Sequence, residues 1–160
     1  MERASLFVAA ASLVVAAGGT GYAWVQRQEV QHTAQTAAAL TETLSVMYQP
    51  GVVWRALAPA EGAPQAKGRL YLAPDGVQGV LMTYDMPRPQ NGRAYQLWLN
   101  NPDSGKRDSG GVFQVDDKGR GHLIVRAPAP FENYKACGVT EEPITGSKWP
   151  TGTRALTGQL

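Results

Sequence analysis

An uncharged run near the N-terminus constrains the chain most. From Ala4 to Gln26 no side chain carries a charge. This length suits a helix, which needs roughly 20 residues to cross about 30 Å of hydrocarbon. Tyr22 and Trp24 suit the far interface, where aromatic rings settle at the level of the headgroups. We therefore predict a transmembrane anchor over residues 1–26, with the N-terminus in the cytoplasm.

A cleaved signal peptide is the alternative reading of the same run. Val15-Ala16-Ala17 offers small residues of the kind that signal peptidase accepts after a short apolar core. Both alternatives export the remainder of the chain. With the anchor, we expect a single-pass protein of the plasma membrane whose C-terminal domain is extracytoplasmic.

The composition limits the part of the chain beyond the anchor. The 160 residues leave room for one soluble domain, and 18 Gly with 11 Pro favour β structure with short connections. The 15 basic and 13 acidic residues alternate without forming a run. A nucleic-acid partner is therefore not expected, because such proteins gather Lys and Arg on one face.

Residues 27–49 contain neither Gly nor Pro and are rich in helix formers. Apolar residues recur there at steps of three and four, which predicts a helix: Val30, Ala34, Ala37, Leu40, Leu44 and Met47. We interpret 27–49 as a short juxtamembrane helical stalk that ends before Pro50. Its many polar residues leave two alternatives open, a free stalk or an element docked on the next domain.

From residue 50 to residue 160 the pattern changes to short runs with period-two alternation. Gly, Pro, Asn or Asp bounds each run, which is typical of a multi-stranded antiparallel fold. The expected strands lie near Val52–Leu57, Gly68–Leu72, Gln78–Tyr84, Arg93–Leu99, Gly111–Val115, Gly121–Arg126, Ala136–Glu141 and Thr153–Thr157. We predict an all-β, antiparallel β-sandwich. Asp116-Asp117-Lys118-Gly119 predicts a tight hairpin between residues 113–115 and 123–125.

The strand Tyr95-Gln96-Leu97-Trp98-Leu99 has two distinct faces. Tyr95, Leu97 and Leu99 share one face, and Gln96 and Trp98 share the other. We expect a central core strand. Trp98 then either covers a second small cluster or belongs to a ligand surface.

Few residues suggest catalysis. Glu141 and Glu142 are adjacent, so a strand would turn them to opposite faces, and we expect one of them to hydrogen-bond a loop. Cys137 with His122 would be the minimum for a thiol nucleophile and its base, yet the neighbours of Cys137 are typical of strand packing.

Metal and cofactor sites are not expected either. No Cys or His recurs at metal-ligand spacing. Residues 100–105 read as a turn, with a weak calcium site as the alternative. We therefore expect no enzyme activity, no metal and no cofactor.

Several separated motifs together resemble a known family. They are Tyr95-Gln96-Leu97-Trp98-Leu99, Gly110-Gly111-Val112-Phe113, Val139-Thr140-Glu141-Glu142-Pro143, Gly146-Ser147 and Pro150-Thr151-Gly152. In that order they resemble the C-terminal, extracytoplasmic domain of the anti-sigma-K factor RskA family, over about Val52 to Leu160. The residues taken from them as structural or ligand-surface positions are Tyr95, Gln96, Leu97, Trp98, Gly111, Thr140, Glu141, Pro143, Gly146, Pro150, Thr151 and Gly152.

The resemblance implies a bacterial single-pass protein. In that family a cytoplasmic domain holds a sigma factor, and the exported domain controls proteolytic release. A regulatory protease would act here within 27–49. Only Met1-Glu2-Arg3 precedes the uncharged run, too little for an interface of roughly 800 Å² per partner, so we expect no direct sigma-factor binding from this chain alone. A late start codon, a split system or a reused sensor domain would each explain this.

The first hypothesis is a membrane-anchored regulatory protein of the anti-sigma type with an exported sensor or binding domain, acting on sigma-factor activity and transcription. Its partner would be another membrane or envelope protein. The alternative is an exported envelope module that binds a glycan or a protein and has no link to transcription. A hydrolase ranks third.

Overall fold

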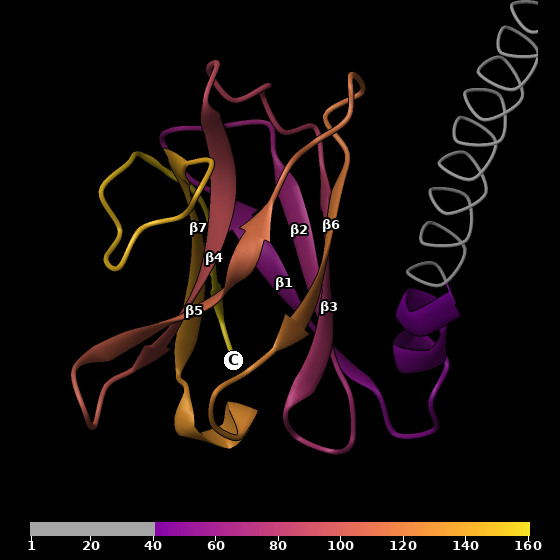
Figure 1. Cartoon of the computed structure of the whole chain (residues 1–160). Helices are drawn as coiled ribbons and strands as arrows, with labels where there is room; N and C mark the ends of the chain where they lie inside the picture. The colour runs from indigo at the N-terminus through magenta and orange to yellow at the C-terminus, as the bar shows by residue number, and fades with distance from the viewer. Residues whose placement is uncertain (1–40) are drawn as a thin grey trace, which may run out of the picture. The chain divides into compact units, whose positions relative to one another are not determined.

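The computed structural model describes residues 41–160, which contain eight antiparallel strands (Figure 1). Period-two alternation and Gly-containing turns produce them. The strands are β1 (Val53–Pro59), β2 (Lys67–Leu72), β3 (Gln78–Tyr84), β4 (Arg93–Asn101), β5 (Lys106–Phe113), β6 (Gly121–Arg126), β7 (Ala136–Pro143) and β8 (Arg154–Gln159). A 3-10 turn, η1 (Phe131–Asn133), precedes β7. A strand lies at or across each of the eight expected positions, although the one expected at Gly111–Val115 runs over Lys106–Phe113 instead. The antiparallel β class is confirmed.

The two-sheet sandwich that we expected is replaced by one sheet. Its strand order is β5-β4-β7-β8-β1-β2-β3-β6. Strand β1 makes the sheet continuous, because it pairs with β2 over Val53–Leu57 and with β8 at Ala58 and Pro59. The edge strands β5 and β6 contact each other, so the sheet curves into a nearly closed barrel around one interior (Figure 1).

The prediction of a hairpin between residues 113–115 and 123–125 is wrong, although the turn expected at residues 116–119 forms. The Asp116 carboxylate accepts hydrogen bonds from the backbone N–H groups of Lys118 and Arg120. Beyond a single bridge between Val115 and Gly121, β5 and β6 contact each other but form no ladder of paired residues. Strand β5 pairs with β4, and β6 pairs with β3, because each finds a longer partner on its other side.

The interior of the barrel is the main core. Leu97 and Leu99 of β4 are fully buried there, as the alternation predicted, and Tyr95 is 2% exposed. Tyr95 donates its phenolic hydroxyl to the carbonyl oxygen of Pro87 at 2.9 Å. The free thiol of Cys137 also faces this core.

A second, smaller cluster involves the end of the expected stalk. Residues 41–47 are helical, and Val46, 1% exposed, packs with Ala73 and Val80 of the β domain. Residues 43–47 of the expected stalk are therefore docked on the β domain, and we call them the docked segment. The remainder of the stalk, residues 27–40, and the predicted anchor over 1–26 lie outside the described residues. Within 41–160 no helix has the length and apolarity that a membrane span requires.

Candidate functional site

The outer face of β4 and β7 carries a buried polar site. Tyr95, Leu97 and Leu99 point inward, so strand alternation turns Gln96 and Trp98 outward. They are nevertheless only 2% and 4% exposed, and Thr140 of β7 is 5% exposed. The segment 144–153 between β7 and β8 covers them, and it is the yellow loop beside β7 in Figure 1. We call this segment the covering loop.

Glu142 lies at the centre of this site and is fully buried. Its Oε1 accepts hydrogen bonds from the Thr140 hydroxyl at 2.6 Å, the Thr151 backbone N–H at 2.8 Å and the Gly152 backbone N–H at 3.1 Å. Its Oε2 accepts from the Ser147 hydroxyl at 2.8 Å and from the Thr151 hydroxyl. One carboxylate thus binds three residues of the covering loop.

The pKa of Glu142 follows from this arrangement. Burial acts to raise it, because removing a charge from water is costly. The hydrogen bonds from the side chains of Thr140 and Thr151 and from the backbone of Gly152 and Thr151 outweigh burial and lower the pKa from 4.5 to about 2. All of these donors are neutral groups. Glu142 is therefore an ionised, structural carboxylate at neutral pH.

Gln96 holds the same loop from β4. Its side-chain Oε1 accepts the backbone N–H of Ser147 at 2.8 Å, and its Nε2 donates to the carbonyl oxygen of Ser147 at 3.1 Å. The same Nε2 lies 2.9 Å from the hydroxyl of Ser109 on β5. Gln96 and Glu142 together anchor the first half of the covering loop through Ser147.

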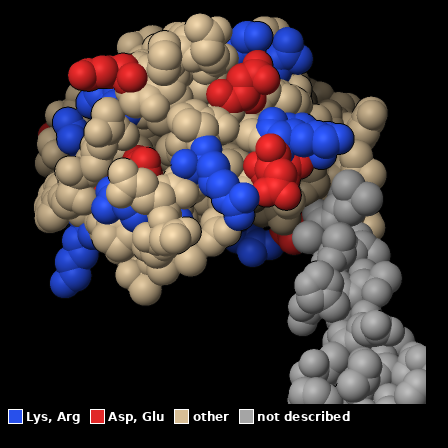
Figure 2. All heavy atoms as spheres, turned by 90° about the horizontal axis from the view of Figure 1, so that it is seen from above, with Lys and Arg blue, Asp and Glu red and all other residues tan. Residues whose placement is uncertain are grey.

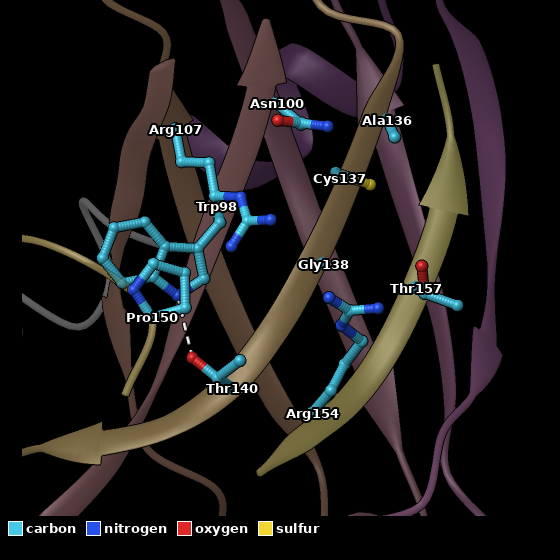
Figure 3. Close-up of a pocket in the computed structure, with 10 residues that line it drawn as sticks. All are labelled: Trp98, Asn100, Arg107, Ala136, Cys137, Gly138, Thr140, Pro150, Arg154 and Thr157. Carbon is cyan, nitrogen blue, oxygen red and sulfur yellow. Dashed lines mark hydrogen bonds between the residues drawn. The ribbon is translucent and has the colours of Figure 1, made fainter. Parts of the chain in front are cut away.

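Trp98 is tied into the network by its indole nitrogen. Its Nε1–H donates to the Thr140 hydroxyl at 2.8 Å, shown as the dashed line in Figure 3. The Thr140 hydroxyl in turn donates to Glu142. Trp98 thus fixes the orientation of a hydroxyl that stabilises the buried carboxylate. We expected Trp98 either to cover a second small cluster or to belong to a ligand surface. It is buried under the covering loop, and its ring also lines a hollow together with Pro150.

Close approach explains the glycines of the covering loop. A β-carbon at Gly152 would lie 1.7 Å from the carbonyl oxygen of Glu141. Gly146 has a φ of +78°, which side chains other than glycine rarely adopt. These two positions let the loop turn back and lie flat on β7.

The structure brings together seven of the twelve positions taken from the motifs. They are Gln96, Trp98, Thr140, Gly146, Pro150, Thr151 and Gly152. The others lie elsewhere. Tyr95 and Leu97 are core residues, Gly111 stands in the irregular stretch of β5 opposite Leu97, and Pro143 is the exposed last residue of β7.

Glu141 turns away from Glu142, as two neighbours on a strand should. It accepts a hydrogen bond from Arg93 Nε at 3.0 Å and one from the backbone N–H of Gln90. The loop-binding carboxylate of the site is Glu142, which the twelve positions omitted together with Ser147. The alternation of β4 could have identified Glu142. Gln96 points outward, so its partner Thr140 on β7 also points outward, and so does Glu142 two residues further along.

The remaining chemical candidates do not assemble. Cys137 is 3% exposed in the core, and burial raises the pKa of its thiol to about 12. His122 is exposed on β6, far along the sheet from β7. No cluster of metal-ligating side chains is present within 41–160. The loop at residues 100–105 is a turn in which Asn101 Oδ1 accepts the backbone N–H groups of Asp103 and Ser104.

The surface charge is mixed. Figure 2 shows basic and acidic side chains next to one another on the face that it draws. Exposed ion pairs join Lys67 to Asp85, Arg88 to Asp117 and Arg120 to Asp116. This mixing is what the sequence pattern of alternating charge indicated.

The fold and the site define a small antiparallel β domain whose buried polar network secures its own loop. A family model described as anti-sigma-K factor RskA, C-terminal, matches residues 6–158. The chain therefore belongs to this family of regulatory proteins. The match begins well before Val52, where we expected the resemblance to start. No curated protein and no solved structure is detectably similar to the chain.

Proposed function

We propose that this chain is a membrane-anchored regulatory protein of the anti-sigma type, whose β domain is an exported sensor that influences sigma-factor activity. The family match over residues 6–158 is the observation that carries the proposal. The structure supports the proposal because Glu142, the charged residue of the buried site, holds the covering loop in place by hydrogen bonds.

The extent of the match also supports the membrane location. It begins at residue 6, inside the uncharged run Ala4 to Gln26. The family pattern therefore includes the segment whose length and lack of charge suit a membrane span. On this proposal the chain crosses the plasma membrane once, and the β domain lies outside the cytoplasm.

The docked segment suggests how the domain and a protease are connected. In this mechanism a regulatory protease cuts within 27–49, upstream of the docked segment. Thr43 and Val46 are 6% and 1% exposed, so the packing of Val46 on Ala73 and Val80 limits how far a protease can reach along the chain. A signal that alters the β domain would change this contact and thereby the rate of cleavage.

Export is tested with reporter fusions. Alkaline phosphatase fused after Gln49 should be active, because this enzyme requires an oxidising compartment, whereas a reporter that works only in the cytoplasm should be silent there. The same two reporters fused after Arg3 serve as the control for the opposite side. Activity of the cytoplasmic reporter after Gln49 would refute export.

An exported binding module with no link to transcription is the second candidate. The observation that favours it is the hollow beside Trp98, which is lined by polar and basic groups. Co-purification of partner proteins distinguishes the two candidate functions. The regulatory proposal expects the full-length chain to co-purify with a membrane complex that contains a sigma factor, and a binding module alone should recover none.

A further inference from the structure

A hollow of about 120 Å³ lies on the outer face of the sheet next to the covering loop (Figure 3). It is lined by Trp98, Asn100, Arg107, Ala136, Cys137, Gly138, Thr140, Pro150, Arg154 and Thr157. Strand register explains its position. Trp98 of β4 pairs with Gly138 of β7, which pairs with Thr157 of β8. Because Gly138 has no side chain, a space remains in the middle of this row.

Two arginines flank this space from opposite sides. Arg107 comes from β5, where it pairs with Asn100, and Arg154 comes from the start of β8, where it pairs with Thr140. Figure 3 shows both guanidinium groups pointing into the hollow, on either side of Gly138. Within the described part of the chain neither group has a hydrogen-bond or ion-pair partner, whereas Arg88, Arg93 and Arg120 each pair with a carboxylate.

The lining contains no acidic side chain that could neutralise them. Asp108, next to Arg107, lies on the other side of β5 and accepts a hydrogen bond from the Tyr134 hydroxyl at 2.7 Å. Glu142 is on the same outer face, but both of its oxygens bind donors of β7 and the covering loop. Two positive charges therefore face one small space into which residues 41–160 place no counterion.

We propose that this hollow binds an oxyanion group, a carboxylate or a phosphate, carried by a small exported ligand. Each guanidinium presents a planar fork of donors that matches two oxygens at once. Asn100 and Thr157 add neutral polar groups, while Pro150, Ala136 and the small exposed part of the Trp98 ring form the apolar side of the hollow. The volume fits one such group and a few neighbouring atoms.

If the hollow binds the signal of a regulatory domain, that role rests on the proposed function. The test is a calorimetric titration of the full-length chain in detergent at low ionic strength. The probes are N-acetyl-alanyl-alanine, its C-terminal amide and inorganic phosphate. We expect saturable binding of the free acid or of phosphate and none of the amide, and whichever oxyanion binds identifies the source. Added salt should weaken binding, because it screens the arginines.

Variants show whether the hollow is responsible. Arg107→Gln and Arg154→Gln should each weaken binding by about tenfold or more, since each removes charge-assisted hydrogen bonds. Arg88→Gln, at an exposed arginine paired with Asp117, is the control and should bind as the unsubstituted chain does. Gly138→Ala should also weaken binding, because its β-carbon would enter the hollow 4.0 Å from Arg154 Nε.

Three results would overturn the site. They are equal binding of acid and amide, unchanged binding in both Arg107→Gln and Arg154→Gln, and no binding of either oxyanion up to about 10 mM. Because the titration measures binding alone, its failure leaves the transcriptional role standing. Normal binding without any effect on transcription would reject the regulatory role and keep the site.

Discussion

Gly152 lies so close to the carbonyl oxygen of Glu141 that a β-carbon at position 152 would fall 1.7 Å from it. Gly152→Ala must therefore push the covering loop away from β7. We expect a loss of stability of about 1–3 kcal/mol and faster tryptic cleavage after the exposed Lys148 of that loop. Limited trypsin digestion followed by mass spectrometry measures this.

Gly138→Ala is the matched control for that substitution. Its β-carbon would meet its closest neighbour, the Leu156 carbonyl oxygen, at 3.3 Å, which a small adjustment relieves. Cleavage after Lys148 should be unchanged in this variant. Equal cleavage rates in Gly152→Ala and in the unsubstituted chain would contradict the close packing of the covering loop on β7.

Removing the carboxylate of Glu142 should destabilise the domain strongly. Glu142→Ala leaves the N–H groups of Thr151 and Gly152 and three hydroxyls without their acceptor. Buried donors without partners cost about 1–3 kcal/mol each, so we expect a total loss of about 3–5 kcal/mol after relaxation. Urea unfolding followed by tryptophan fluorescence gives the value, and the exposed Glu61→Ala is the control.

Glu142→Gln should be milder than Glu142→Ala. Its carbonyl oxygen can still accept from Thr151 and Gly152, and the hydroxyls of Ser147 and Thr151 can rotate to accept from the new amide. An alanine variant that unfolds at the same urea concentration as the glutamine variant would show that the network does not secure the loop.

The lowered pKa of Glu142 predicts an acid-dependent stability. Unfolding returns the pKa from about 2 to 4.5, so between these values the unfolded chain binds more protons and stability rises with pH. About 3 kcal/mol is therefore present above pH 4.5 and lost as the pH falls toward 2. Urea unfolding at several pH values between these limits measures it.

Comparing the pH dependence of stability in the unsubstituted chain and in Glu142→Gln isolates the contribution of Glu142. The pKa of Asp116 is also lowered to about 2, mainly by the side-chain hydrogen bond from Arg120, so part of the acid loss remains in the variant. We expect the slope of stability against pH to be smaller in Glu142→Gln. Parallel slopes in the two proteins would mean that Glu142 is not held ionised by the network.

The docked segment provides a test of the proposed link to proteolysis. Val46→Asp places a charge where Val46 packs, 1% exposed, against Ala73 and Val80. The docked segment should detach, because burying an unpaired carboxylate is costly. A broad-specificity protease should then cut within 43–49 as readily as upstream. The exposed Tyr48→Asp is the control, and equal cleavage of both variants would contradict docking.

The strands were predictable because their signals are local. Alternation in Tyr95–Leu99 fixed which side chains enter the core, and Gly- or Pro-containing turns bounded the runs. The joining of the strands into one sheet was not predictable. It depends on β1 changing partner at Ala58, a pairing between residues about 100 positions apart that no local pattern records.

The site was predicted only in part for a similar reason. The motifs drew attention to Gln96, Trp98 and the covering loop, yet they do not say which of two adjacent glutamates faces that loop. Arg154 and Thr157 are three residues apart and would face opposite sides of a regular strand. An irregularity in the pairing of β7 and β8 brings both to the hollow, and it has no signature in the sequence.

On the proposed function, the exported β domain regulates sigma-dependent transcription. The most direct measurement compares transcripts in the native bacterium with and without an in-frame deletion of residues 50–160, after the reporter fusions have established export. We expect the genes of one sigma factor to change together, and we expect restoration of the full-length chain to reverse the change. An unchanged set of transcripts in cells that normally produce the chain would contradict it.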